Sequence, residues 1–335
     1  IELPSGEVGQ KFTDWLAQND PAKVDPMIEI AITPNRQDAL GVHGIARDLA
    51  ARGLGTLKPL KEAHVPGQYP CPVSVTIDAD AATDGCEIFA GRLIRGVQNG
   101  PSPKWLQDRQ RAIGLRPISK LVDVTNFFTH DRNRPLHVFD ADKVQGGALR
   151  IHRTEGGETL VGLDEKTYTF GPGQVVISDA AGVESIGGIM GGLSTGCTQD
   201  TVNVFLEAAV WDRIQIAHTG RALKINSDAR YRNERGIDPA YNMQAIEDAT
   251  QMILDLCGGE PSEVVVAGRV PDTARSYRLD PARVVSLVGM EIPESEQRQT
   301  LTRLGFRMEG NMAHVPSWRP DVLGEADLVE EVARV

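Results

Sequence analysis

Residues 202–210 read VNVFLEAAV, a mostly apolar run of strand length with β-branched and aromatic residues. Two helix-like segments, at 105–114 and 239–259, lie on either side of it. Strands and helices alternate here without a regular βαβ rhythm, which predicts an α+β domain over about 69–267 rather than a doubly wound sheet. Further strand-like runs are VSVTIDAD at 73–80, LRIHRT at 149–154 and QVVISD at 174–179.

Residues 239–259, PAYNMQAIEDATQMILDLCGG, give the clearest helix signal. Asp238 is a candidate N-cap because its carboxylate can accept a hydrogen bond from the first turn, and Pro239 suits the first helical position. Gly258 and Gly259 should end the helix. Apolar residues recur at helical spacing and predict one buried stripe, made of Met243, Ile246, Ala249, Ile253 and Leu256.

The segment at 33–53, TPNRQDALGVHGIARDLAARG, predicts another helix. Either Asn35 or Asp38 could cap its first turn, and Gly53 should end it. The apolar face of this helix is expected to consist of Leu40, Val42, Ile45, Leu49 and Ala50.

The chain divides into four parts by composition and pattern. Residues 1–27 are polar, and we expect them to be the remnant of a preceding domain. We expect residues 28–68 to form a connecting helix and a linker. We expect the α+β domain over residues 69–267, and the helices with a small hairpin that follow predict a winged-helix-like module at 268–335. The chain opens on Ile1 and its last helix carries no C-cap, so we expect an interior piece of a larger protein.

The composition limits the classes of function. The formal net charge is −11, so the chain as a whole repels nucleic acid, whose binding depends largely on neutralising phosphates. RNA contacts would have to be local, at the basic runs 104–120 and 213–235, although charge alone favours a solvated face there. No run approaches the ~18 apolar residues of a membrane span. The four scattered cysteines indicate reduced thiols and a cytoplasmic protein.

One motif is typical of a different enzyme class. Residues 192–196 read GLSTG and match the G-x-S-x-G signature of serine hydrolases, with Asp200 and His218 as conceivable partners of Ser194. That signature requires a strand-to-helix turn, whereas the residues that follow are turn- and strand-like. A glycine-rich turn is therefore the preferred interpretation, and a serine hydrolase remains an alternative.

Three features of the α+β domain are candidates for a binding site. Glu207 interrupts an apolar strand, where an unpaired carboxylate is costly, so it is either paired structurally or placed to bind a polar group. His137 lies in the segment RPLHVFD. The glycines of GGIMGG at 187–192 allow either a backbone that approaches a ligand closely or two tight turns.

The last predicted helix carries a cluster of acids. Asp327, Glu330 and Glu331 fall at i, i+3 and i+4 and share one face, and Asp321 lies just upstream. Four converging carboxylates suit a hard cation such as Mg²⁺. The alternative is an acidic first turn together with an ordinary pair between Glu330 and Arg334.

Several long segments together make the chain resemble the β subunits of bacterial phenylalanyl-tRNA synthetases, in the family's order and at similar spacing. They are IEIAITPNRQDALGVHGIARDLA (28–50), KLVDVTNFFTHDRNRPLHVFD (120–140), GGIMGG (187–192), NERGIDPA (233–240) and PSWRPDVLGEADLVEEVARV (316–335). The resemblance implies a subunit that acts with an α subunit, in an α2β2 tetramer, to attach phenylalanine to tRNA(Phe). The α subunit then carries the adenylation site.

The resemblance further implies that the α+β domain edits, that is, hydrolyses tyrosine wrongly attached to tRNA(Phe). A pocket for phenylalanine rejects the larger tyrosine imperfectly, whereas a second site that hydrogen-bonds the phenol can discriminate strongly. By the family pattern Glu207 reads the tyrosine hydroxyl, and the backbone of Gly187 and Gly188 contacts the substrate.

The remaining roles also follow from the resemblance. His137, Thr125 and Asn126 place the ester and the attacking water, and Arg116 meets the terminal nucleotide of the tRNA. The residues that correspond to the family's Mg²⁺ site, which faces the α subunit, are Asp321, Asp327, Glu330 and Glu331.

Two positions depart from the family pattern. Asn233 stands before ERG, where the family usually has an aromatic residue. Asn133 stands where glycine is usual, although asparagine is the next-best residue for a left-handed turn. Neither residue is expected to touch the mapped pocket. Within this resemblance, the alternative is a domain that has lost hydrolysis and serves only as a tRNA-binding scaffold.

Overall fold

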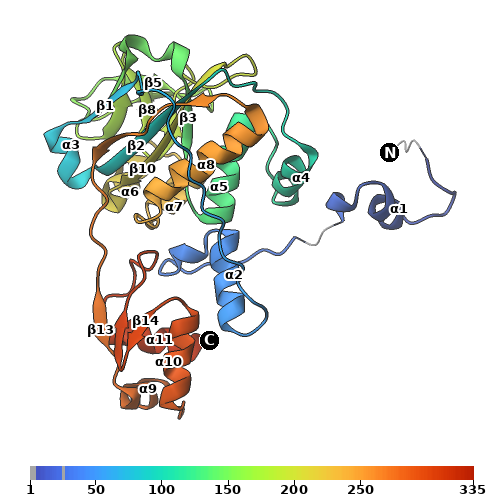
Figure 1. Ribbon diagram of the computed structural model, residues 1–335, viewed down its shortest axis with the longest axis vertical. Helices are drawn as coiled ribbons and strands as arrows, with labels where there is room; N and C mark the ends of the chain where they lie inside the picture. Colours follow the sequence, from blue (N-terminus) through green and yellow to red (C-terminus); the bar gives the residue numbers. More distant parts are fainter. Residues whose placement is uncertain (1–4, 25–26) are drawn as a thin grey trace.

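The computed structural model describes residues 5–24 and 27–335, so part of the predicted N-terminal remnant lies outside the described residues. The main body has three layers (Figure 1). An outer β-sheet packs on one face of a central β-sheet, and two helices cover the other face of the central sheet. A smaller module of helices and a three-stranded sheet follows and lies below the main body in the figure.

The central sheet has the strand order β11-β2-β10-β3, with β12 also paired to β2. The strand predicted at 202–210 is confirmed as β10 (Asn203–Trp211), which pairs antiparallel with β2 (Cys86–Arg95). The prediction omits β2, whose apolar pattern is interrupted by glycine and arginine at Gly91 and Arg92. The sheet is completed by β3 (His137–Asp140), β11 (Glu260–Pro261) and β12 (Val265–Gly268).

The outer sheet has the order β1-β4-β7-β8-β9. Within it, β1 and β4 are parallel and the other neighbours are antiparallel, as expected for mixed helices and strands rather than a doubly wound sheet. Its strands, with a separate ribbon of β5 and β6, are β1 (Ser74–Ile77), β4 (Ala148–Arg153), β5 (Thr159–Val161), β6 (Thr167–Thr169), β7 (Val175–Ser178), β8 (Val183–Ile186) and β9 (Met190–Gly191).

Alternate residues of β10 divide the main body into two cores, because successive side chains of a strand point to opposite faces. Phe205 and Ala209 pack toward the outer sheet. Leu206 and Ala208 pack toward the helices α5 and α8. Glu207 shares the face of Phe205 and Ala209, so the carboxylate lies between the two sheets. The main-body helices are α3 (Ala79–Asp84), α4 (Lys104–Ala112), α5 (Lys120–Arg132), α6 (Arg213–Ala222), α7 (Asp228–Asn233) and α8 (Asn242–Cys257).

The helix predicted at 239–259 is α8, but its start differs from the prediction. Asp238 is not its N-cap: the carboxylate accepts from the Ala240 N–H at 3.0 Å in the turn before the helix. The predicted end is confirmed, since Gly258 follows Cys257 with φ of +67°. The predicted stripe packs on the central sheet through Ile246, Ala249 and Ile253.

The segment 33–53, called the bridging segment below, connects the main body to the C-terminal module. Its helix α2 (Val42–Ala51) begins later than predicted, and neither Asn35 nor Asp38 caps it. The predicted apolar face is wrong in part, because Val42 and Leu49 are exposed. Close packing replaces apolar side chains here: a Cβ on Gly41 would lie 2.5 Å from the backbone nitrogen of Asn133. Upstream, α1 (Phe12–Asn19) has no buried residue.

The C-terminal module has its own apolar core, which includes Leu301, Phe306 and Leu328. Its sheet has the order β13-β15-β14. The winged-helix classification of this module stays a prediction. Its elements are β13 (Ser276–Arg278), α9 (Pro281–Val288), α10 (Glu294–Arg303), β14 (Arg307–Glu309), β15 (Met312–His314) and α11 (Glu325–Arg334).

Candidate functional site

A cavity of about 270 Å³ lies between the two sheets and the helices α5 and α7. Its walls come from segments far apart in the sequence: α5, β3, β8, the turn at 187–191, β10 and α7. Of the residues predicted for the site, those that line the cavity are Thr125, Asn126, His137, Gly188 and Glu207. The structure therefore brings together most of the predicted site, on rigid elements of both sheets.

Glu207 is buried on β10, with 5% of its surface exposed. Its Oε2 atom has no hydrogen-bond partner in the described structure. Burial raises the pKa of Glu207 to about 8, because a charged carboxylate is poorly solvated between the sheets, and the charge of Arg134 only partly opposes this rise. At neutral pH the group is therefore mostly uncharged, and it can both donate and accept a hydrogen bond.

His137 lies directly opposite Glu207 in the antiparallel pair of β3 and β10. Its ring packs edge-on against Phe139, with ring centroids 4.5 Å apart. Burial lowers the pKa of His137 to about 4, so the imidazole is neutral at neutral pH. Its Nε2 atom is buried without a partner in the described structure. Buried polar atoms that lack partners are uncommon in proteins, and two of them across one strand pair indicate a site for a polar ligand.

Helix α5 places Thr125 and Asn126 on the cavity wall. The Thr125 hydroxyl donates to the Val122 carbonyl at 2.8 Å, and its remaining lone pair can accept a hydrogen bond from a ligand. Asn126 is half-buried and offers both a donor and an acceptor. The α5 wall thus adds polar groups to the cavity.

The glycine-rich turn contacts the cavity through Gly188 and Gly191. Gly188 has φ of +66°, and a Cβ there would lie 2.6 Å from the Trp211 ring, so both conformation and space require glycine. Gly187 does not line the cavity; it is buried beside it, where a Cβ would also lie 2.6 Å from Trp211. A Cβ on Gly191 would overlap the His137 ring.

Arg116 is the predicted site residue that lies outside the cavity. It is exposed on the loop between α4 and α5 and does not line the cavity wall. This position is compatible with contact to a larger ligand that extends beyond the cavity, which stays a prediction.

Residues that the sequence prediction did not place in the site also contribute to it. Asn233 lines the cavity, so the expectation that it stays clear of the pocket is wrong. Asp228, on the same helix α7, lines it as well. Arg134 is buried, donates to the Ala209 carbonyl at 3.0 Å and bonds Asn242. Sequence signals for these three residues are weak, because their roles depend on contacts between segments far apart in the chain, such as Asn233 with Gly188 and Arg134 with Ala209.

Asn133 behaves as its residue type predicts. It ends α5 in the left-handed conformation, with φ of +53°, and does not line the cavity. Its side-chain amide donates to the Gln37 carbonyl at 2.8 Å and so ties α5 to the bridging segment.

The serine-hydrolase alternative lacks the required geometry. Residues 192–196 form a turn that leads toward a strand rather than a helix. The Ser194 hydroxyl donates to Glu184, whose pKa is raised by burial. Asp200 and His218 are exposed, and in the described structure no hydrogen bond joins either of them to Ser194.

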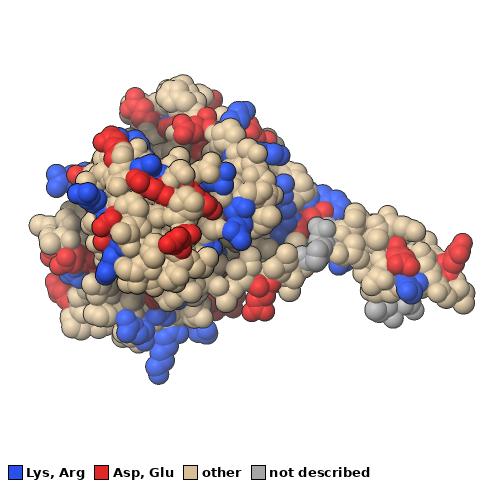
Figure 2. Space-filling view, turned by 90° about the horizontal axis from the view of Figure 1, so that it is seen from below, with Lys and Arg blue, Asp and Glu red and all other residues tan. Residues whose placement is uncertain are grey.

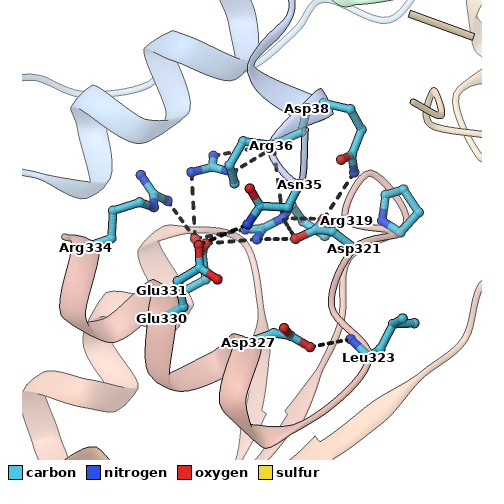
Figure 3. Close-up of polar contacts among 12 residues, drawn as sticks. Asn35, Arg36, Asp38, Arg319, Asp321, Leu323, Asp327, Glu330, Glu331 and Arg334 are labelled. Atoms are coloured by element: carbon cyan, nitrogen blue, oxygen red, sulfur yellow. Dashed lines mark hydrogen bonds and ion pairs between the residues drawn. The ribbon is translucent and has the colours of Figure 1, made fainter. Parts of the chain in front are cut away.

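The four acids predicted to hold Mg²⁺ do not form one cation site in the described structure. Asp321 is bound by Arg319 at 2.7 Å (Figure 3). The Gln37 amide also donates to Asp321, at 3.1 Å. Asp327 accepts from the backbone of Leu323 and Gly324 at the start of α11.

The other two acids also have protein partners. The Asn35 amide donates to Glu330 at 2.9 Å. Glu331 is 1% exposed and is bound by Arg319 at 2.9 Å and by Arg334 at 2.6 Å (Figure 3). Burial opposes ionisation of Glu331, but the two arginines outweigh it and lower its pKa to about 2. Arginine thus occupies the position that the prediction gave to a metal. Within residues 5–24 and 27–335, no three or more His, Cys, Asp or Glu side chains are placed to hold a metal ion.

The surface charges are mixed rather than gathered into one basic area on the face shown in Figure 2, where Lys and Arg are interspersed with Asp and Glu. Of the predicted basic runs, 213–235 is partly paired within itself, since Arg230 and Arg235 both bind Glu234. Among the described residues, no helix has both the length and the apolar character needed to cross a membrane.

Comparison with known proteins confirms the resemblance expected from the sequence. Residues 85–258 match the B3/4 domain, and residues 277–335 match the tRNA synthetase B5 domain. The chain is 74% identical over its 335 residues to the phenylalanine–tRNA ligase beta subunit of Ruegeria pomeroyi, of which it spans 42%. It is 65% identical over its whole length to the subunit of the same name from Cereibacter sphaeroides, of which it spans 41%.

One solved structure is also similar, an N-terminal fragment of the phenylalanyl-tRNA synthetase beta subunit from Pyrococcus horikoshii. It is 17% identical, with 96% of this chain and 93% of that chain covered. Its TM-score of 0.46 is too low to show a shared fold.

Proposed function

The chain belongs to the B3/4 domain family and continues into a tRNA synthetase B5 domain, and on this basis we propose that its main domain hydrolyses tyrosine wrongly esterified to tRNA(Phe). The observation that carries the proposal is that Glu207 and His137, neighbours on adjacent strands, line the same cavity, each with a buried polar atom that lacks a partner in the described structure. Such a cavity suits an aromatic residue with one polar group.

Selection of tyrosine rests on Glu207. The phenolic hydroxyl supplies the partner that the buried carboxyl group lacks, whereas a phenylalanine ring in the same place leaves that group unpaired. Gly188 allows the backbone turn to approach the ring closely. The site therefore discriminates because the buried carboxyl group is paired when tyrosine is bound and unpaired when phenylalanine is bound.

Hydrolysis needs a water molecule placed on the ester. Water oxygen adds to the ester carbonyl carbon, the bond to the ribose oxygen breaks, and a water proton ends on that oxygen, giving tyrosine and tRNA. Neutral His137 can accept a hydrogen bond from this water through Nε2. Thr125 and Asn126 orient the ester and water from α5. No covalent intermediate with the protein is involved.

The properties of a complete subunit are proposals of the same kind, because the chain spans less than half the length of the relatives. We propose aminoacylation of tRNA(Phe) together with an α subunit in an α2β2 tetramer, in the cytoplasm, with Arg116 near the tRNA terminus. A role for Mg²⁺ belongs to that assembly. Two of the carboxylates proposed for it, Asp321 and Glu331, are bound by arginine in this chain, and the four do not fit a cation as they stand.

Deacylation of tyrosyl-tRNA(Phe) by the full-length protein with its partner subunit tests the proposal. We expect His137→Ala to lower the rate about 100-fold, in the range typical for loss of a group that positions a proton transfer. Glu207→Ala should remove the preference for tyrosyl over phenylalanyl ester.

The matched control is Glu184→Ala, which removes another buried glutamate of the same domain that does not line the cavity. Its deacylation rate should stay near that of the wild type. Full activity in both cavity variants would refute the assigned site, and a wild type that does not clear the ester would favour the scaffold alternative.

A further inference from the structure

Two carboxyl groups line the cavity in contrasting surroundings. Glu207 is deep between the sheets, whereas Asp228 is the first residue of α7 and its side chain is 58% exposed. Of the residues that line the cavity in the described structure, none is lysine or arginine. A cavity with a carboxylate at its exposed end and no cationic side chain in its wall suits a ligand that itself carries positive charge.

Asp228 keeps one oxygen available. Its Oδ1 atom binds Arg232 at 2.9 Å. The nearest partner of Oδ2 is His130, at 3.8 Å, which is longer than a hydrogen bond. Burial lowers the pKa of His130, and the charge of Arg232 lowers it further, so the imidazole adds no positive charge beside Asp228. Arg232 is the cation that pairs with Asp228 in the described structure, and it does so through Oδ1 alone.

A second acceptor lies on the same helix. Asn233 is 4% exposed, and its Nδ2 donates to the Gly188 carbonyl at 2.8 Å. Its Oδ1 is buried with no partner in the described structure. The N-cap residue Ser227 bonds the next carbonyl of the turn, that of Ile189, at 2.7 Å. Helix α7 is therefore fixed against the glycine-rich turn, and it presents a carboxylate and an amide to one cavity.

We propose that α7 forms a subsite for the α-ammonium group of the aminoacyl ester, with Asp228 as its counter-charge and Asn233 as the residue that positions the wall. This inference rests on the proposed function. It divides recognition between the two ends of the cavity: Glu207 binds the polar group of the side chain, and Asp228 binds the charge next to the ester. The site then accepts esters with a free α-ammonium and disfavours N-acylated ones.

The test compares two esters of tRNA(Phe) that differ at one group, the tyrosyl ester and the 3-(4-hydroxyphenyl)propionyl ester, which lacks the amine. Single-turnover hydrolysis is measured with the full-length protein and its partner subunit. We expect the wild type to prefer the tyrosyl ester by about tenfold in kcat/KM, as is typical for one charge-assisted contact. Asp228→Asn should lose about that factor on the tyrosyl ester and change the des-amino ester less than twofold.

Two further variants separate charge from structure. Asp228→Glu keeps the charge and should recover part of the preference. Glu294→Gln removes another i, i+4 pair, with Arg298 at 2.5 Å on α10, and should leave both rates unchanged.

The possible outcomes are distinct. Equal losses on both esters in Asp228→Asn, or no loss on the tyrosyl ester, would overturn the inference while leaving the proposed function in place. A wild type that hydrolyses neither ester would refute the proposed function, and this inference with it.

Discussion

At the scale of the residue, the main feature is a carboxyl group kept uncharged inside a β-sheet. Glu207 faces the cavity from the middle of β10, and the paired His137 is neutral for the same reason, burial. Both groups are therefore poised as hydrogen-bond partners rather than as charges. Their effect on a ligand depends on pH and on the space that the neighbouring glycines leave.

The pKa of Glu207 predicts a pH dependence of selectivity. The pKa is raised to about 8, so the carboxyl group is neutral below that pH and charged above it. A charged carboxylate gains a stronger hydrogen bond from a phenol, and is more costly to bury beside a phenylalanine ring. The ratio of tyrosyl to phenylalanyl deacylation should therefore rise between pH 7 and 9, measured by single-turnover rates corrected for spontaneous hydrolysis. In Glu207→Gln the ratio should not vary with pH; a wild-type ratio that is flat across this range would contradict the assignment.

Gly191→Ala should impair hydrolysis through His137. An added Cβ would overlap the imidazole ring, so the ring or the turn must shift, at a cost of about 1–3 kcal/mol. We expect a fall in deacylation rate of about tenfold or more, because small displacements of positioning groups are costly in catalysis. Gly171→Ala is the control, since a Cβ there meets nothing within 4 Å. Equal rates in the two variants would show that the ring position does not matter.

At the scale of the element, each cavity wall is held by the segment behind it. Helix α5 ends at Asn133, whose side chain bonds the bridging segment, and Arg232 of α7 donates to the Leu40 carbonyl at 3.1 Å. Both helices that line the cavity are thus fixed by residues 37–40. The bridging segment works through backbone acceptors and close approach, which explains why its helix has so few buried apolar residues.

Asn133 allows this link to be divided into two contributions. Asn133→Gly keeps the left-handed turn but loses the hydrogen bond to the buried Gln37 carbonyl, and should lower the free energy of unfolding by about 1 kcal/mol. Asn133→Ala loses the same hydrogen bond and also replaces asparagine, which tolerates the left-handed conformation, by a residue that adopts φ of +53° at a cost of about 1–2 kcal/mol. Urea unfolding of both variants measures the difference. Equal losses would mean that the turn conformation contributes nothing.

At the scale of the whole molecule, a buried network of charges joins the bridging segment to the C-terminal module. Arg36 lies 4.0 Å from Glu331 (Figure 3). Asp48 is bound by Arg36 at 2.8 Å and by Arg334 at 2.6 Å. Arg47 also lies over the Trp318 ring, 4.2 Å from its centroid. Glu331, which was predicted to hold a metal, therefore takes part in the contacts that set how the two parts of the chain meet.

Arg319→Met should strongly destabilise this junction. The guanidinium binds Asp321 and Glu331, and its removal leaves both carboxylates in a buried site without their main partner. Breaking a buried pair in this way costs about 3–5 kcal/mol. Arg307→Met, which breaks an exposed pair with Glu309, should change the unfolding temperature far less, because water and salt screen that pair. Thermal unfolding compares the two, and similar effects would argue against a network that holds the junction.

Acid should weaken the same junction. The pKa of Glu331 is lowered from 4.5 to about 2 in the folded protein, so the unfolded chain takes up its proton first as pH falls. The stabilisation from Glu331 is present above pH 4.5 and is lost progressively toward pH 2. Urea unfolding at several pH values should show this loss in the wild type and a shallower one in Glu331→Gln. The same slope in both proteins would assign the acid sensitivity to other groups.

Much of the main domain follows from local sequence. The apolar run of β10 predicts a buried strand because periodicity and residue type act locally. The glycines at 258–259 predict the end of α8 because conformation at one residue is a local property. The position of Glu207 within an apolar strand indicates a candidate site, since an unpaired carboxylate there is costly unless it has a partner or a ligand. The roles of the neighbouring site residues came from family resemblance rather than from pattern.

Which groups meet depends on the tertiary structure. Asn233 and Asp228 enter the cavity because α7 packs on the glycine-rich turn, which no local pattern encodes. The carboxylates near the chain's C-terminal end have a helical spacing that fits a cation, yet Arg319 lies among them. Arg319 is 12 residues from Glu331 in the sequence, and Arg36 is nearly 300 residues away. Only the packing of the chain brings these partners together. Spacing tells which side chains share a face, and the fold determines what lies opposite that face.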